Sequence, residues 1–194
     1  MDDHFAALGR RRFLLTAAAA AVLTHPTARA LAQAETCGAP TEPNIEGPFF
    51  RPGAPLRDVL AGPGVDGERL ALSGRVLDTS CRPIAGVRLE IWHADHRGDY
   101  DLDGNHLRGV LESDARGRWS LRSIVPGRYR NGAQYRPSHV HVKVAAPRKP
   151  LLTTQLYFQG DPFLAADPFV RRSLVLRLRD GEGGKVGAFD FVVA

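Results

Sequence analysis

Apolar and polar residues alternate with a period of two along much of the chain after residue 69. The alternating stretches are 70–78, 87–94, 119–124, 139–144, 153–158, 173–178 and 188–193. Because successive side chains of a strand point to opposite faces, this alternation is typical of half-buried β-strands. Turns rich in glycine and proline separate the stretches, and no segment carries a convincing helical stripe. The pattern predicts an all-β fold, an antiparallel β-sandwich of the prealbumin/immunoglobulin-like kind.

Two segments depart from this alternation. Residues 35–66 are rich in proline, glycine and polar side chains, and we expect an extended N-terminal arm that packs across the domain. Residues 164–171 are the one stretch that could form a short helix. The predicted sandwich domain therefore spans 67–194, with the arm before it.

Residues 1–34 have the composition of an export signal. Three arginines at 10–12 precede a short apolar run at 14–23, and small residues at 32–34 offer a cleavage site. The run is too short to span a membrane. The arginine pair followed by x-Phe-Leu resembles a twin-arginine signal, which carries folded cargo, and an ordinary secretion signal is the alternative. We expect a protein exported to the periplasm.

Charge limits the classes of partner. The whole chain carries a net charge of +5, and removal of residues 1–34, with four arginines and two aspartates, leaves +3. The remaining arginines are interspersed with acids and form no basic run, so a nucleic-acid-binding surface is not expected. The remainder, about 160 residues, is long enough for one well-buried core.

The chain has two cysteines, Cys37 and Cys81. An even number of cysteines in an exported protein favours a disulfide, which would tie the arm to the first core strands. Two free buried thiols and metal ligation are the alternatives. The wide spacing, without a Cys-x-x-Cys motif, is weak support for metal ligation.

The segment 136–141 contains the most informative pattern of the chain. It ends in His139 and His141, which lie two residues apart in a predicted strand and therefore share one face. Val140 and Val142 then point the other way, into a core. A His-x-His pair also occurs by chance on protein surfaces, so this spacing alone does not establish a metal site.

Two tyrosines add to the possible donor set. Tyr100 and Tyr129 lie in separate predicted loops upstream of the histidines. Two imidazoles and two phenolates carry two negative charges together, which suits a hard ferric ion better than zinc or copper(I). Tyrosine titrates near a pH of about 10, so the metal would have to displace the phenolic proton. A core or rim position is the alternative for each tyrosine.

Longer motifs surround these residues in order along the chain. The motifs are 46–50 (Glu-Gly-Pro-Phe-Phe), 86–95, 98–100, 113–119, 124–129, 135–141 and 152–162. Together, from about Glu42 to the C-terminus, they resemble the intradiol ring-cleavage dioxygenases, whose members include catechol 1,2-dioxygenases and protocatechuate 3,4-dioxygenases. The resemblance implies a non-haem Fe(III) enzyme that inserts both atoms of O2 into a catechol-type diol and yields a cis,cis-muconate-type diacid.

The resemblance also implies roles for individual residues. Four would hold the iron: Tyr100, Tyr129, His139 and His141. Tyr129 matches the ligand that leaves the iron when substrate binds, and Arg136 and Gln155 match residues beside the ring carbon that becomes electron-rich. A fixed guanidinium can stabilise negative charge that develops there. The implied partners are a catechol-type small molecule and O2, with no membrane span, and a homo-oligomer is an open alternative to a monomer.

The chain departs from the family pattern at three places. Phenylalanines at 49–50 stand where many relatives carry tyrosine, which bears on substrate identity. The segment 129–139 is short, so the pocket wall differs from that of better-known enzymes. We also find no room for the N-terminal helical dimerisation domain of typical catechol 1,2-dioxygenases.

Other readings of the same residues are weaker. A metal-free, exported prealbumin-like binding module is the main alternative, and a zinc hydrolase lacks an Asp or Glu at ligand spacing to the histidine pair. We expect three further histidines at the rim or surface: His93, His96 and His106. The acidic run at 99–104 mimics the start of an EF-hand, but Val110 stands where the loop's last acidic ligand is required.

Overall fold

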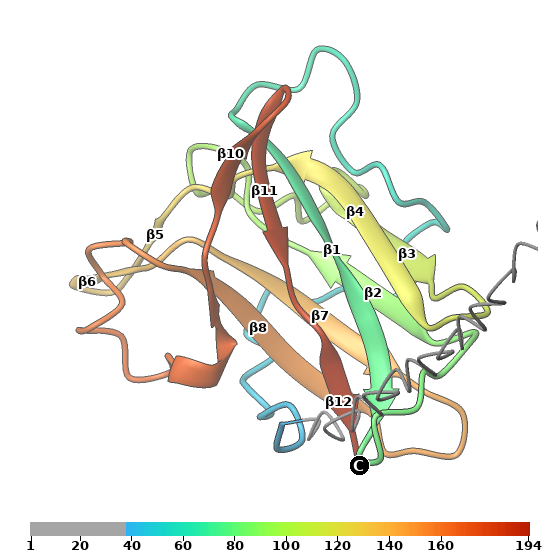
Figure 1. The fold of residues 1–194 in the computed structure, drawn as a ribbon. Helices are drawn as coiled ribbons and strands as arrows, with labels where there is room; N and C mark the ends of the chain where they lie inside the picture. Colours follow the sequence, from blue (N-terminus) through green and yellow to red (C-terminus); the bar gives the residue numbers. More distant parts are fainter. Residues whose placement is uncertain (1–37) are drawn as a thin grey trace, which may run out of the picture. The chain divides into compact units, whose positions relative to one another are not determined.

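The computed structural model describes residues 38–194, which form a β-sandwich (Figure 1). Two five-stranded sheets enclose the core, and a separate two-stranded hairpin stands beside them. Within these residues there is no α-helix, and one 3-10 turn, η1 (Arg172–Leu174), precedes the last strands. The predicted all-β sandwich is therefore confirmed.

The first sheet is built around one long strand. Its strands are β1 (Arg69–Asp78), β4 (Arg118–Ile124), β10 (Arg179–Gly181), β11 (Gly184–Ala188) and β12 (Phe191–Val193). β1 pairs with β4 in antiparallel orientation, and with β11 and β12 in parallel orientation along successive parts of its length. The sheet is thus mixed, where the sequence pattern predicted antiparallel strands throughout.

The second sheet carries the residues of chemical interest. Its strand order is β3 (Arg108–Glu112), β2 (Arg88–Trp92), β7 (His139–Ala145), β8 (Leu152–Phe158) and β9 (Val175–Leu176). All pairs are antiparallel except β8 with β9. The separate hairpin consists of β5 (Tyr129–Asn131) and β6 (Gln134–Arg136), and it leads directly into β7.

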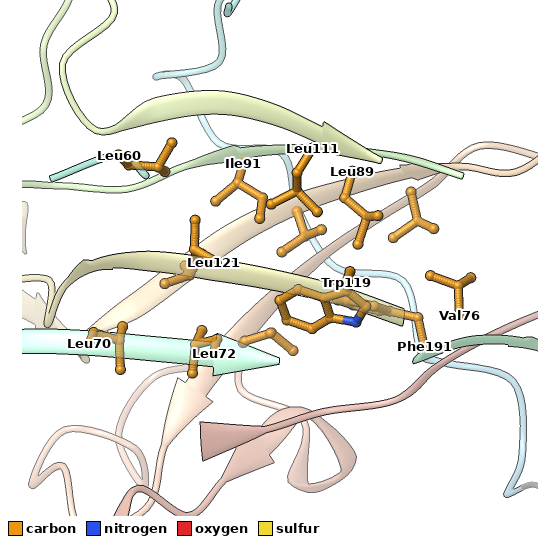
Figure 2. Packing of buried hydrophobic residues seen from close by; sticks show 14 of the residues in the cluster. Leu60, Leu70, Leu72, Val76, Leu89, Ile91, Leu111, Trp119, Leu121 and Phe191 are labelled. Carbon is orange, nitrogen blue, oxygen red and sulfur yellow. The ribbon is translucent and has the colours of Figure 1, made fainter. Parts of the chain in front are cut away.

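Side chains from both sheets fill the core between them (Figure 2). Leu72 and Trp119 come from the first sheet, and Leu89 and Ile91 come from the second. Leu60, from the segment before β1, is 4% exposed and belongs to the same core. Burial of each large apolar side chain contributes roughly 1.5–3 kcal/mol, so this layer fixes the position of the second sheet.

Residues 38–66 follow the two sheets in extended form with isolated bridges. Leu56 bridges to Val110, and Val59 bridges to Arg122. The backbone N–H of Asn44 also donates to the carbonyl of Thr153 at 2.8 Å. The limits of the predicted arm, 35–66, stay a prediction, and the part before residue 38 lies outside the described residues.

Three segments differ from what the alternation suggested. The segment 164–171 forms turns, because Pro168 has no N–H to donate and the carboxylate of Asp167 accepts the backbone N–H of Phe169 at 2.8 Å. The strand expected at 173–178 is reduced to η1 and the two residues of β9. Strand β3 was not predicted, because residues 108–111 are all buried and show no alternation.

Several predictions fall on residues outside the described range. The export signal at 1–34 and Cys37 belong to this part, so the signal and the disulfide between Cys37 and Cys81 stay predictions. Within residues 38–194, no helix is both long and apolar enough to cross a membrane.

Candidate metal centre

Strand β7 presents two histidines on one face, as the spacing predicted. His139 and His141 are 2% and 1% exposed, while Val140 and Val142 point into the core on the other face. Trp92 lies opposite His141 in the register of β2 and β7, and the two rings stack with centroids 4.7 Å apart and planes 9° apart. The sheet therefore fixes both imidazoles.

The hydrogen bonds of His139 define its tautomer. Its Nδ1 lies 2.7 Å from the carbonyl oxygen of Pro137, which can only accept, so Nδ1 carries the proton. The lone pair of Nε2 then faces Nε2 of His141 at 3.1 Å and the hydroxyl of Tyr100 at 3.4 Å. The Tyr100 hydroxyl lies 3.1 Å from Nε2 of His141. Three potential ligand atoms thus converge on one point.

Burial keeps these groups neutral in the absence of a cation. It lowers the pKa of His139 to about 4. Burial, and then the neighbouring His139, lower the pKa of His141 well below its ordinary value. Burial also raises the pKa of the Tyr100 phenol. At neutral pH the imidazoles therefore keep lone pairs available for a metal, and the phenol ionises only beside strong positive charge.

The converging atoms fit a metal ion. Protein ligands at roughly 2.0–2.2 Å from one ion lie about 3 Å from each other, as do the facing atoms of Tyr100, His139 and His141. Without a metal, Nε2 of His141 can donate to the lone pair of His139 Nε2 at 3.1 Å, whereas a cation would accept the lone pairs of both nitrogens. Among residues 38–194, no three His, Cys, Asp or Glu side chains gather at a metal-binding distance, so the phenol is needed to complete this set.

The hairpin β5–β6 brings Tyr129 to the same place. The ring of Tyr129 lies 5.7 Å from that of Tyr100 and 5.8 Å from that of His139. Gly98 permits this approach, since a Cβ there would lie 2.2 Å from the carbonyl oxygen of Arg128. The structure therefore brings together all four residues that the sequence suggested as ligands.

Arg136 lies opposite Tyr129 in the hairpin and is 3% exposed. Its Nη1 donates to the Tyr129 hydroxyl at 3.3 Å, and its Nε donates to the carboxylate of Asp167. Burial is the largest single influence and acts against the charge of Arg136, but the hydrogen bond to Asp167, together with the charges of Asp167 and the neighbouring tyrosines, outweighs it and raises the pKa of the guanidinium. Arg136 thus stays a cation beside the converging ligand atoms.

Two residues of β8 hold the other side of this guanidinium. Nη2 of Arg136 donates to Oε1 of Gln155 at 2.9 Å and to the hydroxyl of Tyr157 at 3.0 Å. Gln155 and Tyr157 lie opposite His141 and His139 in the register of β7 and β8. The amide of Gln155 donates in turn to the carbonyl of Ile45 at 2.7 Å. Gln155 therefore connects Arg136 to the arm.

Sequence reasoning missed Tyr157 and Asp167. The spacing of Gln155 and Tyr157, two residues apart on a predicted strand, was a signal that could have placed Tyr157 on the same face. Asp167 gave no such signal, because it lies in a segment without periodicity. A second ion pair lies at the start of the same stretch: Asp161 pairs at 2.8 Å with Arg128, the residue just before β5.

The arm motif at 46–50 covers the converging ligand atoms. Phe49 stacks on Tyr100 with ring centroids 4.2 Å apart and planes 13° apart, and its edge meets Tyr129. Gly47 has φ of 74°, and a Cβ there would lie 3.3 Å from Cε1 of His141. Glycine is therefore favoured where the arm crosses the histidine pair.

The remaining histidines have different environments. His93 is 1% exposed, so its predicted place at the rim or surface was wrong. Its ring nitrogens contact the carbonyl of Ala94 and the hydroxyl of Ser123, both at 2.7 Å, so neither is available for a metal. His96 and His106 are exposed, as predicted.

The loop after Tyr100 is held by Asp101. Hydrogen bonds from the backbone of Gly104 and His106 lower the pKa of Asp101 to about 2.

The fold and this donor set define a class: β-sandwich proteins with two histidines and two tyrosines gathered beside a buried arginine. A family model described as "Dioxygenase" matches residues 45–193. Catechol 1,2-dioxygenase 2 of Acinetobacter lwoffii is 35% identical over 178 residues, which cover 79% of this chain and 65% of that protein. Chlorocatechol 1,2-dioxygenase of Rhodococcus opacus is 32% identical, with 79% of this chain and 72% of that protein covered.

A solved structure of a dioxygenase domain is also similar to this chain. The dioxygenase domain of a dioxygenase carbohydrate-binding protein fusion from Streptomyces sp. SirexAA-E superposes with a TM-score of 0.76 at 42% identity, over 79% of this chain and 97% of that one. The chain belongs to the intradiol dioxygenase family. It spans about two thirds of the length of the two curated relatives named above.

Proposed function

We propose that this protein is a non-haem Fe(III)-dependent intradiol dioxygenase that opens the ring of a catechol-type diol. The observation that supports this most directly is the convergence of three buried ligand atoms, from Tyr100, His139 and His141, at 3.1–3.4 Å. In the overall reaction, the bond between the two hydroxyl-bearing carbons breaks. Each of these carbons gains one oxygen atom from O2, and a cis,cis-muconate-type diacid results.

Four residues would hold the iron: Tyr100, Tyr129, His139 and His141. When bound, the ferric ion supplies a Lewis acid that stabilises the doubly deprotonated diol and withdraws electron density from its ring. The phenolate oxygen of Tyr129 can accept one proton from a substrate hydroxyl. Nε2 of His139 carries no proton, because Nδ1 donates to the carbonyl of Pro137. Nε2 of His141 would bind the iron with its proton on Nδ1.

Arg136 provides fixed positive charge for the reaction. Its guanidinium is held by Asp167 and Gln155 and cannot rotate freely, so its N–H groups are already oriented toward the region beside Tyr129. Such preorganised charge stabilises negative charge that develops on a substrate oxygen. The ring of Phe49 stacks on Tyr100 and covers part of the same region, and partial removal of water strengthens such electrostatic interactions.

The first test is the colour and iron content of the purified protein. Ferric tyrosinate absorbs visible light, so the iron-loaded protein should be wine-red and should consume O2 with at least one of catechol, protocatechuate and hydroxyquinol. The Tyr100→Phe variant should lose iron or shift the visible band while it stays folded, because only the phenolic oxygen is removed. A colourless, iron-free wild-type protein would favour the alternative function, a metal-free binding module.

We also propose that the protein is exported to the periplasm by a twin-arginine signal and contains a disulfide between Cys37 and Cys81. The arginines at 10–11, the apolar run and the small residues at 32–34 support export. Intact mass under non-reducing conditions should show cleavage after Ala34 and one disulfide. The change of both Arg10→Lys and Arg11→Lys should leave the uncleaved chain in the cytoplasm, and unaffected export would argue for the general secretion route.

A further inference from the structure

Four unpaired polar atoms cluster on one face of the second sheet. Among residues 38–194, five buried side-chain atoms have no hydrogen-bond partner within the protein, and four of these belong to the cluster: Glu90 Oε1, Trp92 Nε1, Arg108 Nη1 and His141 Nδ1. Trp92 lies opposite both Arg108 and His141 in the strand register, and Glu90 lies two residues before it in β2. The four side chains therefore share one face.

The four atoms have complementary chemistry. Trp92 Nε1 and Arg108 Nη1 can only donate, and the ionised carboxylate of Glu90 can only accept. Nδ1 of His141 donates whenever Nε2 keeps its lone pair for a metal. One water molecule can accept two such N–H bonds and donate to the carboxylate, and buried waters typically make about three hydrogen bonds of this kind.

The two histidines differ in how their second nitrogen is held. Nδ1 of His139 donates to the backbone carbonyl of Pro137, whereas Nδ1 of His141 has no partner within the protein. A histidine that binds a metal almost always donates its other N–H to a carboxylate, a carbonyl or a water. His141 therefore needs an acceptor that the backbone around it does not supply.

The ring orientation of His141 indicates where that acceptor lies. Nε2 points along β7 toward His139, so Nδ1 lies on the side of the ring nearer Lys143. Lys143 lies opposite Glu90 in the register of β2 and β7. Glu90 is therefore the diagonal neighbour of His141 across the two strands. Long side chains reach across such a diagonal of about 7–8 Å. Glu90 is thus an acidic side chain on the side to which Nδ1 points, and the other carboxylate nearby, Glu46, is already paired with Lys143.

The arm encloses this cluster. Phe50 packs on Trp92 with ring centroids 5.0 Å apart, and Nζ of Lys143 lies 3.5 Å from the centre of the Phe50 ring. The ammonium group of Lys143 forms an ion pair with Glu46 of the arm at 2.5 Å. Lys143 is therefore bound to Glu46 and not to Glu90. Burial raises the pKa of Glu90, as expected for a carboxylate that lacks a direct partner.

We propose that Glu90 is a positioning residue for His141, through one buried water that accepts the Nδ1–H of His141 and donates to the carboxylate. The N–H group of either Trp92 or Arg108 can donate to the second lone pair of this water. This arrangement holds His141 in the tautomer whose Nε2 lone pair faces Tyr100 and His139. The inference rests on the proposed function, because it assigns Nε2 of His141 to the iron.

The test compares Glu90→Leu with Glu90→Gln, and uses Glu112→Leu as the control. Glu112 is an exposed glutamate of β3 that pairs loosely with Arg88 at 3.6 Å. Competition with a chelator should show iron(III) affinity reduced about 10- to 100-fold in Glu90→Leu, with a shifted visible band. Glu90→Gln keeps an acceptor oxygen and should recover most of both. The control should match the wild type, and thermal unfolding of the iron-free variants should show that all remain folded.

Wild-type iron affinity and colour in Glu90→Leu would overturn the proposal. Equal losses of iron affinity in Glu90→Leu and Glu90→Gln would also overturn it, because they would indicate that Glu90 acts through packing alone. A high-resolution crystal structure of the iron-free wild type gives an independent decision. A water within hydrogen-bond distance of both His141 Nδ1 and Glu90 supports the proposal, and a direct bond from Nδ1 to a backbone carbonyl overturns it. If the wild type binds no iron, the proposed function fails. The crystal structure of the iron-free protein still shows whether a water connects Nδ1 of His141 to Glu90.

Discussion

The variant His139→Leu is expected to be colourless, free of iron and inactive toward catechols, yet folded. His139 is 2% exposed and its Nε2 faces two other potential ligand atoms. Leucine fills much of the same volume but offers no lone pair. Since Lewis-acid stabilisation is worth several kcal/mol, turnover should fall by more than about a thousandfold. Elemental analysis, visible absorption and oxygen uptake measure the three effects.

His93→Leu is the matched control, because it makes the same change at a second buried histidine. Both ring nitrogens of His93 are occupied by hydrogen bonds, so its loss should lower the melting temperature but leave iron and colour intact. A His139→Leu protein that keeps one iron per chain and its visible band would remove His139 from the ligand set.

The second large effect is expected from Arg136→Met, which should lower both stability and activity. The Asp167 side chain is 1% exposed and loses its counter-charge in this variant. An unpaired buried charge costs about 3–5 kcal/mol, measured as the free energy of unfolding in denaturant. Loss of the fixed guanidinium should also reduce kcat by about 10²–10³.

A double variant separates these two effects. Arg136→Met combined with Asp167→Asn removes the stranded carboxylate, so stability should recover substantially while kcat stays low. Arg118→Met serves as the surface control: its pair with Asp114 is solvent-exposed and should contribute at most about 1 kcal/mol. Recovery of kcat together with stability would show that Arg136 acts only by holding Asp167.

The sequence predicted those parts of the site that depend on strand periodicity. His139 and His141 share a face because neighbours two apart in any strand do so, and Val140 faces the core for the same reason. The alternation failed where both faces of a strand are covered. In β3, Arg108 and Gly109 are as buried as the residues that follow them, so the pattern that identifies a half-buried strand is absent.

Contacts between distant segments could not be predicted in this way. Asp167 reaches Arg136 from a segment of turns whose path depends on Pro168 and on tertiary contacts, and no local pattern indicates this pairing. His93 was assigned to the rim from its position at a strand end. Its burial instead depends on Ser123, which comes from the other sheet and meets its Nε2.

The two ion pairs beside the hairpin have a mechanical consequence. Arg128–Asp161 and Arg136–Asp167 tie both ends of β5–β6 to one stretch, residues 161–167. We therefore expect Tyr129 and Arg136 to move together with that stretch rather than independently. Residues inserted at the hairpin tip, beyond Asn131, would reshape the wall of the site without altering the spacing between the phenol and the guanidinium.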